Sequence, residues 1–284
     1  MKVYGIMPSR FGSSRFPGKP LAILAGKPLI AWVVEAVKKA KSLDEVFVAT
    51  DDERIVKAVE EYGGKAVMTP SELPSGTDRI ACAATRFIQL SVDTHSLSLA
   101  PCPPDFADDD ILVNIQGDEP LIDPQLIDNL VEKLKSGDYQ MATAVTPIKN
   151  LQDYEAKSVV KVVLAKDDSA LYFSRAPIPC NRDTVPDFDS TSDSASDSTS
   201  ASTSTSTSLY VRHLGIYAYR GGFLKRYIAE PQCELEKTEK LEQLRALYMG
   251  AKIAVVRTED EGVGVDTPED AERVAKLLEC RQTR

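Results

Sequence analysis

Strand-like and helix-like segments alternate along this chain almost from its first residue. Residues 3–7 form a short apolar run typical of a strand, and residues 28–41 repeat apolar side chains at helical spacing. A second apolar run at 45–50 and a helical pattern that ends at Gly63 continue the alternation. Such an order places consecutive strands in one sheet covered by helices, so the sequence predicts an α/β fold.

The alternation continues to the end of the chain. Further strands are predicted at residues 65–68, 111–115, 141–147, 159–165, 170–174, 213–219 and 252–257, and further helices at 124–136, 221–229, 237–249 and 267–279. Most of the sheet is therefore expected to be parallel, because strands that alternate with helices run in the same direction.

Two segments interrupt this pattern. Residues 91–108 are rich in proline and serine, and residues 187–208 consist almost entirely of serine, threonine, alanine and aspartate. The second segment has too little apolar surface to offset the entropy of ordering, so we expect a disordered insertion. Patterned chain continues on both sides of each segment, and the sequence therefore predicts a single domain spanning residues 1–284.

The composition excludes several classes of protein. The formal net charge is −9, whereas proteins that bind nucleic acid non-specifically are usually basic. No apolar run approaches ~18 residues and the first strand begins at Lys2, so neither a membrane span nor a targeting segment is expected. The five cysteines are widely spaced and only two histidines occur, which disfavours disulfides and zinc sites and favours a cytoplasmic protein.

A glycine- and serine-rich loop with three basic residues, Arg10, Arg15 and Lys19, follows the first predicted strand. In open α/β sheets, ligands bind beyond the carboxyl ends of the strands, and glycine lets the backbone approach them closely. The loop matches neither the P-loop nor the dinucleotide-binding glycine pattern. The residue pattern alone therefore gives equal weight to a phosphate-binding loop and to a solvated basic loop.

Two acidic loops are candidates for a metal site. Asp118 follows the buried strand at 111–115, and Asp266 directly precedes the last predicted helix. Taken singly, Asp118 is explained as a turn residue and Asp266 as an acid that stabilises a helix N-terminus. Together with a phosphate-binding loop, the two carboxylates suit Mg²⁺, which takes one or two carboxylates plus substrate phosphates.

Polar residues elsewhere have both a structural and a functional interpretation. Ser75, Gly76 and Thr77 precede an apolar helix, where they either cap the helix or approach a base or sugar with their backbone. Four candidates in the second half are Arg175, His213, Tyr217 and Glu242. Each of these four is more often structural than functional when it is considered alone.

With these segments in order, the chain resembles the 3-deoxy-D-manno-octulosonate cytidylyltransferases, or CMP-Kdo synthetases. The resemblance rests on stretches such as PSRFGSSRFPGKPLAILAGKPLI, PSGTDRIA, ILVNIQGDEPLI, YFSRAPIP, RHLGIYAYR, LEQLR and GVGVDTPEDAERV. Matching stretches cover almost the whole chain outside the two insertions. The resemblance implies a nucleotide-diphospho-sugar transferase-like fold: a central mixed, mostly parallel sheet flanked by helices, with a smaller β-rich region that forms a homodimer.

The resemblance also implies a reaction, in which CTP and Kdo give CMP-Kdo and pyrophosphate with Mg²⁺, for lipopolysaccharide synthesis. The implied catalytic residues are Arg10, Arg15, Lys19, Asp118 and Asp266, of which the two aspartates hold Mg²⁺. The implied nucleotide-binding residues are Pro8, Ser9, Arg10, Lys19, Ser75, Gly76, Arg79, Gln116 and Asp118. The implied Kdo-binding residues are Arg15, Gln116, Arg175, His213, Tyr217 and Glu242.

Two other functions are compatible with the same residues. One is the activation of a related 2-keto sugar acid, such as 8-amino-Kdo or a sialic-type acid, because loop details decide that choice. The other is a non-catalytic nucleotide-sugar sensor with the same fold. Asp118 and Asp266 argue against the sensor, because a protein that only binds has no need of a metal site.

Overall fold

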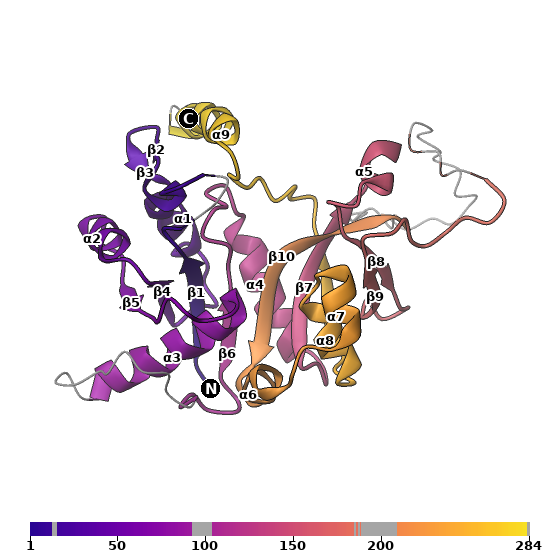
Figure 1. The fold of residues 1–284 in the computed structure, drawn as a ribbon, viewed down its shortest axis with the longest axis horizontal. Helices are drawn as coiled ribbons and strands as arrows, with labels where there is room; N and C mark the ends of the chain where they lie inside the picture. The colour runs from indigo at the N-terminus through magenta and orange to yellow at the C-terminus, as the bar shows by residue number, and fades with distance from the viewer. Residues whose placement is uncertain (13–15, 93–103, 185, 187, 189–208, 283–284) are drawn as a thin grey trace, which may run out of the picture.

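The chain folds around one large mixed sheet, as a computed structural model of the protein shows (Figure 1). The structure describes all residues except 13–15, 93–103, 185, 187, 189–208 and 283–284. Both predicted insertions therefore lie largely outside the described residues. Among the described residues, nine strands form the main sheet in the order β11-β7-β10-β6-β1-β4-β5, with β8 beside β10 and β9 beside β8.

The strands of this sheet are β1 (Val3–Ser9), β4 (Glu45–Thr50), β5 (Ala66–Met68), β6 (Ile111–Asn114), β7 (Met141–Pro147), β8 (Lys161–Leu164), β9 (Ala170–Ser174), β10 (Val211–Arg220) and β11 (Ile253–Arg257). The helices are α1 (Leu29–Val37), α2 (Glu53–Glu61), α3 (Gly76–Val92), α4 (Pro124–Lys135), α5 (Leu151–Glu155), α6 (Gly221–Ala229), α7 (Glu234–Glu239), α8 (Gln243–Tyr248) and α9 (Pro268–Gln282). A 3-10 turn, η1 (Lys19–Leu21), and a small hairpin, β2 (Ile23–Leu24) and β3 (Lys27–Pro28), were not predicted from the sequence, and neither was α5.

The prediction of a mixed and mostly parallel sheet is confirmed. Strands β6, β1, β4 and β5 pair in parallel, and so do β11 and β7. Strand β10 is the exception, because it lies antiparallel between β6 and β7 and joins the two parallel groups. The antiparallel hairpin of β8 and β9 extends the sheet from one end of β10.

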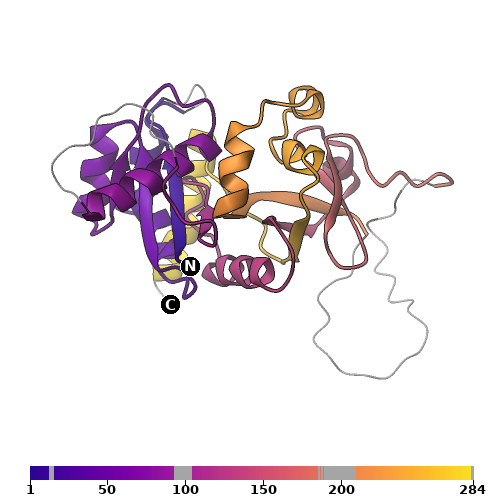
Figure 2. The ribbon, with the colours of Figure 1, turned by 90° about the horizontal axis from the view of Figure 1, so that it is seen from below.

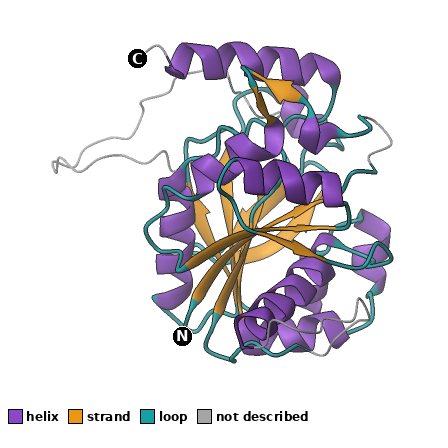
Figure 3. Ribbon diagram, turned by 90° about the vertical axis from the view of Figure 1, so that its left-hand side faces the viewer, coloured by secondary structure: helices purple, strands orange, loops and turns teal. Residues whose placement is uncertain are grey.

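Helices cover both faces of the sheet (Figure 3). In β1, Val3 and Met7 belong to the core formed with α1, α4 and α9, whereas Tyr4 and Ile6 belong to the core formed with α3, α6 and α8. This division follows from the two-residue period of a strand. No helix in the described part of the chain is long and apolar enough to cross a membrane.

The first ninety residues and the segment from β10 to α8 form neighbouring halves of the molecule (Figures 1 and 2). Strand β6 joins them, because it pairs with β1 of the first half and with β10 of the second. The backbones of β6 and β10 pair from Ile111 opposite Arg220 to Asn114 opposite Tyr217. Side chains from both halves can therefore reach a common site at the edge where β6 ends.

The single helix predicted at residues 237–249 was wrong, because two short helices occupy this region. Lys240, with a φ of 54°, ends α7 in the left-handed conformation. The chain then buries Leu241, while the backbone carbonyl of Glu242 accepts a 2.8 Å hydrogen bond from Tyr227 Oη. Helical periodicity contains no signal for such a break, since it is fixed by tertiary contacts.

A buried ammonium group joins the chain before β8 to the chain after β9. Lys161 is fully buried, and its Nζ donates to the carbonyl oxygens of Ala156, Val159 and Arg175 at 2.7–2.8 Å. Desolvation lowers the pKa of Lys161, and the positive charge of Arg175 acts in the same direction. Three hydrogen bonds to one ammonium compensate for its removal from water.

Replacing Lys161 by methionine is expected to lower the free energy of unfolding by about 2–4 kcal/mol, because three partly buried carbonyl groups lose their donor. Urea unfolding followed by circular dichroism measures the change. Lys166→Met removes an exposed ammonium and serves as the matched control. Equal stability of the two variants would contradict a structural role for the buried ammonium.

Candidate active site

The loops that follow β1 and β6 leave the sheet at the same edge. The two strands pair in parallel, with Ile6 opposite Asn114, so their carboxyl ends lie side by side. The turn after β6 comes so close to β1 that a Cβ atom on Gly117 would lie 2.8 Å from the carbonyl oxygen of Pro8. Only glycine fits this contact without displacing the backbone.

Lys19 joins the opening loop to both acidic loops. Its Nζ lies 2.5 Å from Asp118 Oδ2 and 3.2 Å from Asp266 Oδ1. The backbone N–H of Val265 donates to the Asp118 carbonyl at 2.9 Å, and Asp270 accepts from the Asp266 N–H at 3.2 Å. The first bond fixes the third loop beside the second and the second bond orders the third loop itself, so three segments distant in sequence form one charged cluster.

The donor set of this cluster fits a hard divalent cation. Asp118 and Asp266 keep 28% and 50% of their side-chain surface exposed, so a ligand can reach both carboxylates. Within the described residues, no group of three or more histidine, cysteine or acidic side chains could enclose a metal. Two carboxylates with open positions match Mg²⁺, which keeps sites for phosphate oxygens and water.

Glu119 differs from its neighbour Asp118. Burial, with the charges of Asp118 and Asp260 nearby, raises the pKa of Glu119 to about 7. Its Cγ lies against Gly264, where a Cβ atom would be 3.9 Å away. Glu119 therefore packs between the two acidic loops.

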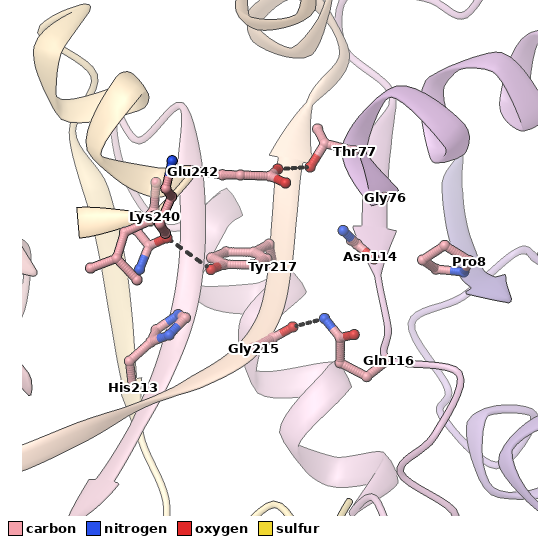
Figure 4. A pocket seen from close by; sticks show the side chains of 12 residues that line it. Pro8, Gly76, Thr77, Asn114, Gln116, His213, Gly215, Tyr217, Lys240 and Glu242 are labelled. Atoms are coloured by element: carbon pink, nitrogen blue, oxygen red, sulfur yellow. Dashed lines mark hydrogen bonds between the residues drawn. The ribbon is translucent and has the colours of Figure 1, made fainter. Parts of the chain in front are cut away.

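A pocket of about 370 Å³ opens next to these loops, between the two halves of the molecule (Figure 4). The residues predicted for the site that line it are Pro8, Gly76, Gln116, His213, Tyr217 and Glu242. They come from the ends of β1 and β6, the start of α3, β10 and the turn between α7 and α8. The pocket thus combines residues predicted for the nucleotide with residues predicted for the sugar acid.

An irregularity in β10 shapes one wall of this pocket. The register with β7 shifts between Leu214 and Tyr217, so Gly215 and Ile216 are extra residues on that side. The carbonyl of Gly215 then accepts a 2.6 Å hydrogen bond from Gln116 Nε2. This bond fixes the Gln116 amide against the pocket wall.

The upper part of the pocket is closed by a contact between the two halves. Thr77 Oγ1, at the start of α3, donates to Glu242 Oε2 at 2.9 Å (Figure 4). Burial raises the pKa of Glu242, although the Thr77 hydrogen bond opposes the shift. Beside it, Tyr217 Oη donates to Gln243 Oε1 at 3.3 Å.

His213 is uncharged at neutral pH. Its side chain keeps some contact with solvent through the pocket, but protein atoms surround the ring, and this burial lowers the pKa of His213 to about 3. Burial also raises the pKa of Tyr217 well above its usual range. Both side chains therefore interact with a ligand as neutral hydrogen-bonding groups.

Two residues predicted for the cytosine end have structural partners. Ser75 Oγ accepts from the Asp78 N–H at 3.1 Å, which is the helix cap considered in the sequence analysis. Arg79 is fully buried, with its guanidinium on Asp51 at 3.1 Å and on Thr69. The Arg79 side chain therefore does not line the pocket, whereas the backbone at Gly76 does.

The remaining predicted residues differ in position. Arg10 is exposed, and its guanidinium donates to the carbonyl oxygen of Leu73. Ser9 is buried, and its Oγ has no hydrogen-bond partner among the described residues. Arg15 lies outside the described residues.

Arg175 is not among the residues that line the pocket. Its guanidinium donates to the carbonyl oxygens of Lys157, Glu239 and Lys240 at 2.7–3.4 Å. Arg175 therefore holds the turn that presents Glu242, in the arrangement that the structure describes.

Six residues that line the pocket were not assigned to the site from the sequence: Thr77, Asn114, Gly215, Lys240, Leu241 and Gln243. Asn114 precedes Gln116 by two residues, so the alternation of a strand was a usable signal for it. Gln243 follows Glu242, but its place in the pocket depends on the break between α7 and α8. For Thr77 the sequence allowed either a helix cap or a backbone contact with a base or sugar, and it did not indicate the side-chain contact with Glu242.

A basic loop and two carboxylates at the carboxyl edge of an open α/β sheet, beside a polar pocket, are the features of a nucleotide-binding transferase. Comparison with known proteins agrees with this class. The model of the family described as "Cytidylyltransferase" matches residues 4–253. Cytidylyltransferases with 15% identity, including one from Leptospira borgpetersenii with a TM-score of 0.54, share the fold.

More similar relatives define the group within this class. The 3-deoxy-manno-octulosonate cytidylyltransferase of Bdellovibrio bacteriovorus is 45% identical over 98% of both chains, and that of Thermodesulfovibrio yellowstonii is 43% identical over 96% of both. A solved CMP:2-keto-3-deoxy-manno-octonic acid synthetase in complex with CTP is 35% identical, covers 99% of this chain and 100% of its own, and superposes with a TM-score of 0.78. The chain therefore belongs to the cytidylyltransferase family, in its group of 3-deoxy-manno-octulosonate cytidylyltransferases, and is a nucleotidyltransferase.

The neutral state of His213 predicts a change of stability with pH. The unfolded chain protonates this histidine near pH 6.5, whereas the folded protein does so only near pH 3, so the unfolded state binds more protons between these values. Stability should fall as the pH drops below about 6.5, by at most about 1.4 kcal/mol per pH unit from this residue.

Urea unfolding at pH 7.5 and pH 5.5 measures this change. His213→Gln should lose about 1 kcal/mol less than the unmodified protein between the two pH values, because glutamine does not titrate. An equal loss in both proteins would show that His213 titrates normally in the folded state.

Proposed function

We propose that this nucleotidyltransferase activates Kdo with CTP, giving CMP-Kdo and pyrophosphate, and so supplies activated Kdo for lipopolysaccharide synthesis. The observation that carries the proposal is the cluster of Lys19, Asp118 and Asp266, in which Asp118 follows the pocket residue Gln116 by two positions. The names of the relatives that match over almost their whole length support the same substrates.

The nucleotide is placed at the edge of the sheet where β1 ends. Lys19 and Arg10 would contact the triphosphate, together with Arg15 of the same loop. Guanidinium and ammonium groups suit phosphate oxygens, and the unpartnered hydroxyl of Ser9 supports a ligand there. The cytosine end would lie near Pro8 and Gly76, with Ser75 and Arg79 supporting this segment from behind.

Asp118 and Asp266 are the residues that would hold Mg²⁺. Bound Mg²⁺ supplies positive charge to the phosphate oxygens and lowers the pKa of a sugar hydroxyl. Lys19 neutralises both carboxylates in the structure described here, and its ammonium remains within reach of phosphate groups at the same edge.

The sugar acid is assigned to the half of the pocket formed by β10 and the turn between α7 and α8. Gln116, His213, Tyr217 and Glu242 line this half and would bind its hydroxyl groups. Arg175 supports the turn that carries Glu242, so its effect on sugar binding would be indirect.

The reaction needs positioning more than covalent catalysis. The anomeric hydroxyl of the sugar acid attacks the α-phosphorus in line, and pyrophosphate leaves. Residues that hold two bound substrates in the reacting geometry account for a large part of such a rate enhancement. The pocket residue Gln116 precedes Asp118 of the charged cluster by only two positions, so substrates bound to both would lie close together.

We also propose that the enzyme is a cytoplasmic homodimer. Among the described strands, β9 pairs only with β8 and carries Leu171, which is 59% exposed. An exposed leucine on a free strand edge suits contact with a second copy. The described cysteines, Cys82, Cys180, Cys233 and Cys280, form no disulfide bonds with one another, as is usual in cytoplasmic proteins.

Pyrophosphate release from CTP, measured with a panel of sugar acids, tests the proposed function. We expect turnover with Kdo, weaker turnover with 8-amino-Kdo, and none with a nine-carbon sialic acid. Turnover with the sialic acid and none with Kdo would reject the proposal. CTP binding without release of pyrophosphate from any sugar acid would identify a nucleotide sensor.

Asp118→Asn is expected to reduce kcat by at least about 1,000-fold, because the loss of a metal-binding carboxylate removes most of the charge stabilisation of the leaving group. CTP affinity, measured by calorimetry, should fall much less. Asp138→Asn, at an exposed position, is the matched control. Unchanged turnover in the Asp118 variant would reject the metal-binding role.

A further inference from the structure

A buried hydroxyl group contacts three polar atoms of β10. Thr143, in β7, is fully buried, and its Oγ1 lies 2.8 Å from the carbonyl oxygen of Ile216 and 3.3 Å from that of Leu214. The same Oγ1 lies 3.0 Å from Nε2 of His213. A threonine hydroxyl has one hydrogen to donate, so these three contacts decide which atom carries each proton.

The two carbonyl oxygens only accept hydrogen bonds, so the hydroxyl hydrogen of Thr143 belongs on the nearer one, Ile216 O. The lone pairs of Oγ1 then face the imidazole ring. An unprotonated Nε2 would place two lone pairs against each other at 3.0 Å. Nε2 of His213 therefore carries a hydrogen and donates it to Thr143.

The other ring nitrogen, Nδ1, is then without a hydrogen in the neutral ring. No described residue forms a hydrogen bond with Nδ1. Side-chain atoms of the described residues that are both fully buried and without a partner do not include Nδ1, so this nitrogen is not sealed from solvent. His213 lines the pocket. Burial lowers the pKa of His213, which keeps the ring neutral at physiological pH.

We propose that Thr143 is a positioning residue that holds His213 in the Nε2–H tautomer, so that Nδ1 accepts a hydrogen bond from a hydroxyl group of the substrate. The inference rests on the proposed function, in which the pocket binds a sugar acid. The ring of Phe173 packs edge-on against the imidazole of His213, with 5.4 Å between the ring centroids. The ring centroid of Tyr217 lies 5.2 Å from that of His213. These rings restrict the plane in which Nδ1 is presented.

A hydrogen bond to the backbone also fixes the orientation of a second side chain in this wall of the pocket. One N–H of Gln116 Nε2 donates to the carbonyl oxygen of Gly215, which fixes the amide oxygen as an acceptor on the other side of the amide group. Glu242, across the pocket, is also an acceptor when it is ionised. These acceptors favour the hydroxyl groups of a ligand over its carboxylate, because a hydroxyl group can donate a hydrogen bond and an ionised carboxylate cannot.

Nitrogen NMR of histidine tests the tautomer directly. The chain has two histidines, so a ¹⁵N-histidine sample with His95→Asn contains a single imidazole, that of His213. We expect a protonated Nε2 and a bare Nδ1 at pH 7.5. An Nδ1–H tautomer would overturn the proposal without any use of a variant at Thr143.

Two variants separate the hydroxyl of Thr143 from its volume. Thr143→Val keeps the shape and removes the hydroxyl, whereas Thr143→Ser keeps the hydroxyl. In the valine variant, His213 should no longer keep a single tautomer. The KM for Kdo should rise about tenfold, because a tenfold change corresponds to the loss of one hydrogen bond, and the KM for CTP should stay unchanged. The serine variant should stay close to the unmodified enzyme in both measurements.

The outcomes distinguish this inference from the proposed function. A folded Thr143→Val variant that has lost the single tautomer of His213 is expected to bind Kdo less well. If its KM for Kdo is unchanged, Nδ1 does not accept a hydrogen bond from a substrate hydroxyl, and the inference is wrong. An absence of turnover with Kdo in the unmodified enzyme would instead overturn the proposed function, because it would appear before any change at Thr143.

Discussion

The parallel pairing of β1 with β6 is the constraint on which the site depends. It places the loop that carries Lys19 and the loop that carries Asp118 at one edge of the sheet, and it lets the Gly117 turn pack against Pro8. The helices on both faces stabilise this pairing through two separate cores, to which alternate side chains of β1 contribute. The charged cluster is therefore held by strands whose side chains are buried in both cores.

The antiparallel strand β10 gives the site its second half. Because β10 pairs with β6 and β7 together, its irregular segment at Gly215 and Ile216 is held on one side by Gln116 and on the other by Thr143. The result is a wall in which backbone carbonyls decide the orientation of side-chain hydrogen bonds. Such preorganised polar groups bind a ligand without reorganising their own partners.

Much of the fold was accessible from the sequence, since strand and helix periodicities depend on local chain geometry. The proximity of Asp118 and Asp266 also followed from their positions at strand and helix ends. The break at Lys240 was not accessible, because buried contacts of Leu241 and Glu242 set it rather than local preference. The same reason applies to Arg79 and Arg175, whose guanidinium groups were predicted near substrates but have protein partners.

The separation in sequence of the three charged residues has a consequence for synthesis of the protein. Lys19 lies 99 residues before Asp118 and 247 residues before Asp266. During translation, the sheet around β1 and β6 can form long before the last carboxylate leaves the ribosome. The charged cluster of Lys19, Asp118 and Asp266 is therefore complete only after residue 266 has been made, long after the strands β1 and β6.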